Sequence, residues 1–342
     1  MKEGENLEGK IMIDLVRYKQ NNPVNSEVEA LFAVTIPIIR GILYSLNRDI
    51  VSTVNGYDNI SLFLLSRLYR EGDGDCGICF EYAVHDAIVN NNPLILDRID
   101  TALTKYCKIK HSSDPTSILF GAEKNGPMQL IDSVNENLTD NSILLTGSKG
   151  QPIKLKKHIQ GVLNAFRKPS ERVKLPSSIN GLWKADLFVG KSDPDKWVGT
   201  TVKINSAQLE AAKGLRMAIV PSKQGKKDGI YLHETKNLIV CPLPYDHSFT
   251  EIFYRAWLIV KYFLNCGATM PKEVLLPMGA DRFVCKFLVE RKDYPVLDVL
   301  EAMDIVKQPG LLTTEEKEAH LIVDTNQTAL NTIVAPTSIK LQ

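Results

Sequence analysis

The residues best suited to chemistry lie on two predicted strands in the second half of the chain. Side chains alternate between the two faces of a strand, so Asp186 falls on one face of the first strand, over 182–190. Thr201 and Lys203 share one face of the second strand, over 197–205. If the strands are neighbours, Asp186 and Lys203 point from the same side of the sheet. A carboxylate is a preferred ligand of hard cations, and a lysine balances the charge of an anion.

A second carboxylate, Glu81, falls on the apolar side of a predicted helix near 77–90. Ile78 and Val84 recur with it at helical spacing. A buried carboxylate without a partner is costly, so Glu81 should meet a cation, a hydrogen-bond donor or a metal ion. The alternative is a pair with His85, one turn further along the helix.

A helix over 206–216 is predicted to follow the second strand. Gln208 lies on its inward stripe, and Glu210 lies about 200° around from Gln208 at about 100° per residue. We therefore expect Gln208 to face the sheet and Glu210 to face water. On this argument Glu81, not Glu210, supplies the second carboxylate.

The order of these segments resembles the PD-(D/E)XK nuclease superfamily. The residues that carry the resemblance are Trp183–Asp186, a turn, Thr201–Lys203 and the helix after them. In that superfamily a strand aspartate precedes an acidic-x-Lys triplet on the next strand, and a glutamate often comes from an upstream helix. This chain departs from the pattern with Thr201 at the acidic position and Ala185 at the usual proline position.

The resemblance implies a metal-dependent DNA endonuclease with catalytic residues Asp186, Lys203, Glu81 and Gln208. It implies that Asp186 and Glu81 bind Mg²⁺, or alternatively Mn²⁺, with the Thr201 backbone carbonyl as a third ligand. Lys203 would orient the attacking water. A divalent cation would neutralise the developing phosphate charge and generate hydroxide. A restriction or phage-defence nuclease, working as a homodimer or with a defence-system partner protein, would suit such a chain.

A basic segment is expected to hold DNA. Residues 151–174 contain seven Lys or Arg residues and one acid, Glu171. Cations on a helix can track phosphates and make binding sensitive to salt. The alternative is a solvated basic helix. The candidate nucleic-acid-binding residues are Lys154, Lys156, Lys157, Arg167 and Lys168.

Two other interpretations remain open at this point. A cysteine hydrolase is indicated by 73–76, which resembles the start of ovarian-tumour-type deubiquitinases, and by 76–80, which resembles papain-like proteases. Cys76 or Cys79 would then be the nucleophile, favoured as a thiolate at a helix N-terminus. However, Asp73 and Asp75 would raise the thiol pKa. His233 and His247 could act as bases, but neither lies in a sequence signature of these families. The second alternative is a non-catalytic nucleic-acid-binding protein, which the missing acid at Thr201 favours.

The elements that must position these residues alternate in a mixed α/β order. The predicted helices span 26–47, where Pro37 should kink or interrupt the helix, and 60–70, 77–90, 95–107, 153–167, 206–216 and 250–264. The predicted strands span 142–146, 182–190, 197–205, 217–221 and 237–241. We expect an α/β (α+β mixed) fold with a restriction-endonuclease-like sheet flanked by helices. Its expected regions are a helical N-terminal part over 1–175, a nuclease-like core over 176–310 and a tail over 311–342.

Composition is that of a globular protein. The chain has 342 residues, 44% of them hydrophobic, and 41 basic residues against 40 acidic ones, which excludes a disordered class and a globally basic one. No run approaches the roughly 18 uninterrupted apolar residues of a membrane helix. The polar start lacks the apolar core of a secretory signal, and the six cysteines are too few for a disulfide framework. We therefore expect a cytoplasmic protein.

Overall fold

The computed structural model describes residues 26–72, 75–110, 113–121, 130–146, 153–174, 185–211, 214–223, 228–245 and 249–307. The chain forms two compact units, one from residues 1–72 and 252–342 and the other from residues 73–251. These bounds do not coincide with the expected regions. The predicted Glu81 helix and the strands of the expected core belong to the same unit, and the tail over 311–342 lies outside the described residues.

The described part of the first unit is helical. Its helices are α2 (Ser26–Ser45), α3 (Arg48–Thr53), α4 (Leu62–Leu68), most of α9 (Phe249–Asn265), α10 (Gly279–Glu290) and α11 (Val296–Lys307). Helix α2 packs against α10 and α11, and it continues through Pro37, so the expected interruption there is wrong. Ile36, Pro37 and Ile38 are all buried, and this apolar burial outweighs the loss of one backbone hydrogen bond.

By length and composition α2 is also apolar enough to span a membrane. Of that apolar window, 67% is buried inside the protein. This degree of burial is typical of the core helix of a globular unit. The sequence argument from uninterrupted apolar runs did not detect this helix, because its apolar residues are interspersed with polar ones.

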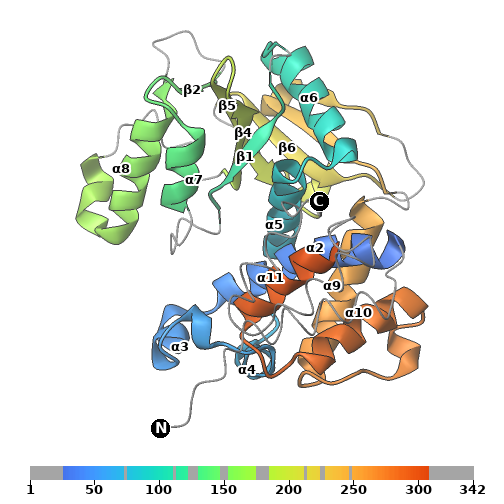
Figure 1. Ribbon diagram of the computed structural model, residues 1–342. Coiled ribbons are helices and arrows are strands. Elements are labelled where there is room, and N and C mark those ends of the chain that lie inside the picture. Colours follow the sequence, from blue (N-terminus) through green and yellow to red (C-terminus); the bar gives the residue numbers. More distant parts are fainter. Residues whose placement is uncertain are drawn as a thin grey trace, which may run out of the picture. The chain divides into compact units, whose positions relative to one another are not determined.

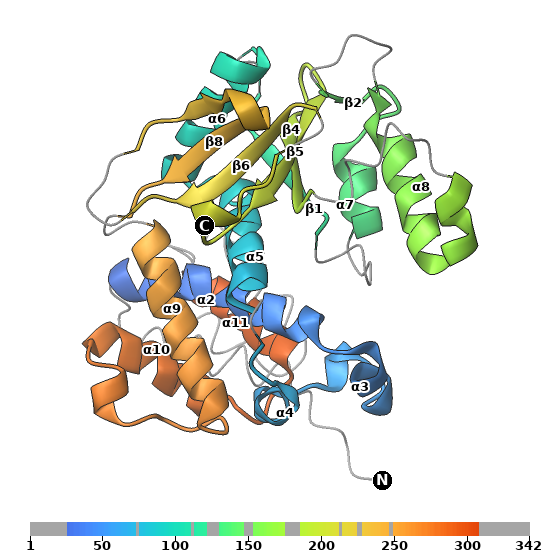
Figure 2. The same ribbon diagram turned by 180° about the vertical axis from the view of Figure 1, so that it is seen from behind.

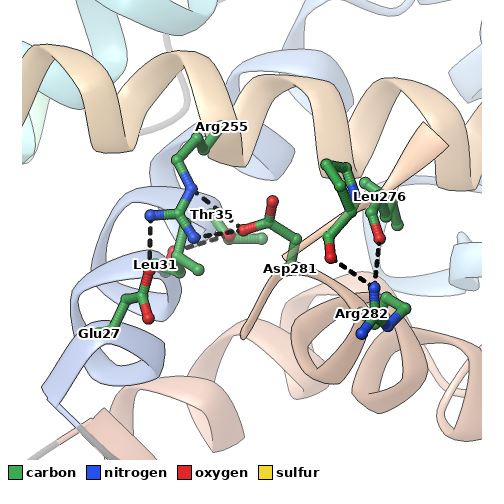
Figure 3. Close-up of polar contacts among 8 residues, drawn as sticks. Glu27, Leu31, Thr35, Arg255, Leu276, Asp281 and Arg282 are labelled. Carbon is green, nitrogen blue, oxygen red and sulfur yellow. Dashed lines mark hydrogen bonds and ion pairs between the residues drawn. The ribbon is translucent and has the colours of Figure 1, made fainter. Parts of the chain in front are cut away.

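A network around Arg255 of α9 joins three helices of this unit (Figure 3). Its guanidinium is 2.7 Å from Glu27 of α2 and 2.6 Å from Asp281 of α10. Burial lowers the pKa of Arg255, but the hydrogen bonds to Asp281 and Glu27 outweigh it and raise the pKa overall. Asp281 is only 5% exposed. The buried carboxylate therefore has the partner that its burial requires.

The second unit is built on a mixed sheet. Its path runs β1-β4-β5-β6-β8-β7, and β2 joins β5 and β3 at the side. The pairs β1–β4, β4–β5 and β7–β8 are antiparallel, whereas β5–β6 and β6–β8 are parallel. The strands are β1 (Thr116–Leu119), β2 (Ile143–Leu144), β3 (Ile153–Lys154), β4 (Leu187–Lys191), β5 (Lys196–Val202), β6 (Arg216–Pro221), β7 (Tyr231–His233) and β8 (Leu238–Leu243).

Helices pack on this sheet, which confirms the mixed α/β class. They are α5 (Asp75–Val89), α6 (Pro93–Cys107), α7 (Leu130–Asn137) and α8 (Leu155–Arg167). Helices α5 and α6 lie on one face of the sheet, and α7 and α8 lie beside β1 and β2 (Figure 1). Seen from behind, β6 and β8 lie in front of α6 (Figure 2). A core cluster that includes Phe120, Phe188 and Trp197 joins α7 and α8 to β1, β4 and β5.

The helix expected over 206–216 is wrong. Of the described residues in this range, only Ser206–Gln208 is helical, as a short 3-10 helix, and β6 begins at Arg216. Leu209 is instead buried against Leu238, and its carbonyl oxygen accepts a hydrogen bond of 2.6 Å from Lys236. Because a short isolated helix is marginal in any case, these tertiary contacts decide the backbone path.

The Arg255 network predicts how the first unit responds to substitution. Asp281→Ala should lower the free energy of unfolding by about 1.5–3 kcal/mol, because it removes a charged hydrogen-bond partner from a buried site. Chemical denaturation followed by circular dichroism measures the change. Lys286→Ala in the same helix is the control, since its contact with Glu290 is 3.9 Å long and exposed. Equal losses in both variants would contradict the proposed importance of the network.

Candidate active site

Asp186 is held by the backbone at the start of β4. Its N–H donates to the Thr200 carbonyl oxygen over 2.8 Å, and its own carbonyl oxygen accepts from Phe120 (2.9 Å) and Gly121 (2.7 Å). Asp186 is 8% exposed. These bonds tie it to β5 on one side and to the end of β1 on the other. The position of its side chain is therefore fixed by three strands.

The two oxygens of the Asp186 carboxylate differ in their surroundings. Oδ2 accepts hydrogen bonds from Thr201 Oγ1 (2.9 Å), Val202 N (2.8 Å) and Lys203 Nζ (3.0 Å). From the part of the chain that the structure describes, Oδ1 accepts none. The structure thus places Asp186 and Lys203 together, as the strand alternation predicts. One carboxylate oxygen is saturated and the other is left for a ligand.

Glu81 of α5 reaches the same place from another element. It is 9% exposed, and its Oε1 lies 3.8 Å from Lys203 Nζ. A methyl group at Gly121 would lie 3.1 Å from Glu81 Oε2 and 3.2 Å from Asp186 Oδ1. Both carboxylates therefore converge beside Gly121, where the absence of a side chain leaves room. Two converging carboxylates repel each other, and a cation between them relieves that repulsion.

His85 lies one turn further along α5. Its Nδ1 is 2.5 Å from Oγ of Ser117, a buried residue of β1. This contact fixes α5 against the sheet. Because this contact holds α5 in place, it also directs the Glu81 side chain toward Asp186.

The donor set fits a hard cation that keeps much of its water. Within the described ranges no group of three or more His, Cys, Asp or Glu side chains gathers for a metal ion. Mg²⁺ is usually bound through one or two carboxylates and several waters. Asp186 Oδ1 and Glu81 Oε2 match that requirement. The Thr201 hydroxyl has a different role, because it donates to Asp186 Oδ2; its backbone carbonyl as a ligand stays a prediction.

A pocket of about 290 Å³ opens beside Asp186. Gln208 and Glu210 both line it, and both are exposed. The helical argument that separated them is wrong, because this segment is not an α-helix. Glu81 is still preferred over Glu210 as the second carboxylate, because Glu81 is buried and converges with Asp186. The full lining is Asp186, Thr201, Lys203, Gln208, Leu209, Glu210, Ala211, Arg216 and Leu238.

The basic helix is present as α8. Its apolar side, with Leu155, Ile159 and Val162, is buried in the core. Lys154 and Lys157 are exposed, and Lys156 is half-buried. Lys168 follows the helix and is exposed, whereas the side chain of Arg167 lies outside the description. These cations do not line the pocket, so they belong to a separate surface of the second unit.

The cysteine interpretation loses support at Cys79. Burial raises the pKa of this thiol well above its usual value, and the neighbouring Cys76, Asp75 and Glu81 raise it further. A nucleophilic cysteine requires a lowered pKa. Of the two candidate bases, His233 Nδ1 lies 3.1 Å from Thr235 Oγ1, and His247 lies outside the described residues.

Sequence analysis missed two residues of this site. Gly121 lies just after β1, a strand that sequence analysis did not predict, and Arg216 begins β6, where a helix was predicted. The available signals were a short apolar run ending in Phe120-Gly121 and an arginine at the start of an apolar strand.

Gly121→Ala should lower the free energy of unfolding by about 1–3 kcal/mol, the usual cost of overpacking. The reason is that the new methyl group would lie 2.9 Å from the Asp186 Cα atom, part of the backbone, and must displace it. Thermal unfolding measures this loss. Gly77→Ala is the matched control, since nothing lies within 4 Å of its methyl group. If the Gly121→Ala protein is as stable as the wild type, the backbones at Gly121 and Asp186 approach each other less closely than described.

Comparisons of the chain with protein-family models, with curated proteins and with solved structures gave no match. The resemblance of Asp186 and Lys203 to the PD-(D/E)XK pattern therefore stays a prediction. What the chain does is inferred from the geometry of this one site.

Proposed function

We propose that this chain is a metal-dependent DNA endonuclease that hydrolyses phosphodiester bonds. The observation that carries the proposal is the convergence of Asp186 Oδ1 and Glu81 Oε2 beside Gly121, with Lys203 bonded to the other oxygen of Asp186. Two carboxylates and a lysine are the residue types that cation-assisted phosphodiester hydrolysis needs. They come from helix α5, from the residue before β4 and from the residue after β5.

Each side chain has a distinct part in the proposed reaction. Asp186 and Glu81 would hold Mg²⁺ or Mn²⁺, and the bound cation supplies charge neutralisation and an acidified water. Lys203 is 34% exposed and keeps one side toward Asp186, so its remaining hydrogens can orient that water. Thr201 and the Val202 N–H hold Asp186 in place by donating to Oδ2. Gln208, on the pocket wall, would contact the substrate.

The substrate is a polyanion, and the second unit offers exposed cations to hold it. Lys154, Lys157 and Lys168 lie in or beside α8 and are exposed. Exposed cations bind phosphates without reading sequence. We place the enzyme in the cytoplasm as a restriction or phage-defence nuclease, acting as a homodimer or with a defence-system partner, by analogy with the family that it resembles.

The proposal predicts a specific pattern of inactive variants. With plasmid and linear DNA, wild-type protein should cleave with Mg²⁺ and not with EDTA. Asp186→Asn, Lys203→Ala and Glu81→Gln should each reduce the cleavage rate by roughly 100-fold or more, because each removes a group of the metal and water site. DNA binding in EDTA should largely survive in all three. Glu210→Gln is the matched control and should cleave at close to the wild-type rate.

Two outcomes would redirect the assignment. An inactive Glu210→Gln with an active Glu81→Gln would move the second carboxylate to the 206–211 segment. Absence of metal-dependent cleavage on duplex DNA, single strands and RNA would favour the non-catalytic binding protein. Cys76→Ser should leave cleavage unchanged, and its inactivation would favour the cysteine hydrolase.

Changes in the basic helix should affect binding rather than chemistry. Replacing Lys154, Lys156 and Lys157 together by Gln should weaken DNA binding and flatten its dependence on salt. The slope of log affinity against log salt should fall by about 0.9 for each phosphate that the variant no longer neutralises. Fluorescence anisotropy with labelled duplex over a range of salt concentrations measures the slope.

A triple variant of equal charge is the control for this experiment. Lys105, Lys108 and Lys110 are exposed at the end of α6 and just after it. Their replacement by Gln should leave the slope unchanged. If both triple variants flatten it equally, the effect comes from net charge and α8 has no special role.

A further inference from the structure

Arg216 is a buried cation in the wall of the pocket. It is the first residue of β6, it is 8% exposed, and it lines the pocket together with Asp186 and Lys203. Arginine at this degree of burial is rare unless it is paired.

The register of the sheet explains why Arg216 points into the pocket. Thr201 of β5 pairs with Ala218 of β6, so these two side chains lie on one face. Arg216 and Lys203 each lie two residues away from a member of this pair, on the same face. Arg216 and Lys203 therefore flank the same part of the sheet, and the pocket lies over it.

The guanidinium of Arg216 has no acceptor among the residues that the structure describes. Across these residues it donates no hydrogen bond and forms no ion pair, in contrast to Arg98 of α6, which donates to two carbonyl oxygens. Burial lowers the pKa of Arg216, and the charge of Asp186 opposes this effect only in part. A buried charge without a partner is expensive. Proteins keep a buried unpaired charge mainly at functional sites, where a bound ligand supplies the opposite charge.

The shape of the group and of the pocket restricts that ligand. A guanidinium presents a planar fork of donors that matches two oxygens of a phosphate. The pocket of about 290 Å³ is just below the roughly 300–1,000 Å³ range of ligand sites. It has room for one nucleotide-sized group, not for a duplex. Lys203, on the same wall, adds a second positive charge.

We propose that Arg216 is the phosphate-binding residue of this site and takes two oxygens of a phosphodiester in a nucleic-acid strand. The inference rests on the proposed function for the identity of the strand, but not for the binding of phosphate. Arg216 binds the phosphate from β6, while Asp186, Glu81 and Lys203 act on the phosphodiester from the carboxylate site. The carboxylate site and the phosphate site are then distinct, and each can be removed without the other.

The first test measures stabilisation by inorganic phosphate without metal. In EDTA at constant ionic strength, phosphate should raise the melting temperature of the wild-type chain, because a ligand that binds the folded state stabilises it. Arg216→Met should show no such rise, and Lys110→Met, which removes one exposed charge, should retain it. No rise in the wild type, or an equal rise in Arg216→Met, would overturn the proposal.

The second test separates a binding role from a structural one. Without phosphate, Arg216→Met should unfold at the same or a higher temperature than the wild type, because it replaces an unpaired buried charge by an apolar chain of similar length. A large fall in the melting temperature would show a structural role and overturn the proposal. Arg216→Lys keeps the charge without the fork, and it should bind phosphate more weakly than the wild type but more tightly than Arg216→Met.

The third test identifies the source of the phosphate. A short oligothymidylate without terminal phosphates contains only phosphodiesters, and its binding is measured by anisotropy in EDTA. Arg216→Met should bind it roughly 10- to 100-fold more weakly than the wild type, the usual effect of removing a charged hydrogen bond. If phosphate stabilisation depends on Arg216 but oligothymidylate binding does not, the ligand is a phosphomonoester and the diester assignment is wrong. Since none of these tests requires cleavage, an inactive wild type would count against the nuclease and not against the phosphate site.

Discussion

The candidate site depends on the hydrogen bonds around Asp186. Its N–H and carbonyl oxygen bind Thr200, Phe120 and Gly121, so one residue links β5, the start of β4 and the end of β1. Its Oδ2 accepts three further donors from β5 and the residue after it. A carboxylate oxygen that accepts three hydrogen bonds holds its side chain in one orientation. The direction of its second oxygen follows from these bonds.

That orientation determines what the rest of the site can do. With Oδ2 saturated, Asp186 has only Oδ1 left for a ligand, and this oxygen points toward Gly121 and Glu81. Glu81 in turn depends on the packing of α5, which the contact of His85 with Ser117 holds against β1. The carboxylate pair therefore results from strand register together with helix docking, and neither is sufficient alone.

The half-buried Arg255 and the buried Arg216 show opposite uses of the same side chain. Arg255 is bonded to Asp281 and Glu27, and its pKa is raised despite burial. Arg216 lacks such partners among the described residues, and its pKa is lowered because burial dominates. The first stabilises a helical unit, since it satisfies a buried carboxylate. The second costs stability at a pocket, and natural proteins retain such a cost where it serves function.

The sequence by itself determined the mixed α/β class and most of the helices and strands, because the hydrophobic period of each segment depends only on local residues. Alternation along β5 also placed Lys203 on the side of Asp186. The 206–216 segment, in contrast, has good helix formers, but the part of it that the structure describes is not an α-helix, since Leu209 is buried with Leu238 and its carbonyl oxygen accepts a hydrogen bond from Lys236. Sequence reasoning named Glu81 as a candidate for the site, but only the tertiary structure brought Gly121 and Arg216 to it. Contacts between residues far apart in sequence have no local pattern, so register and docking alone reveal them.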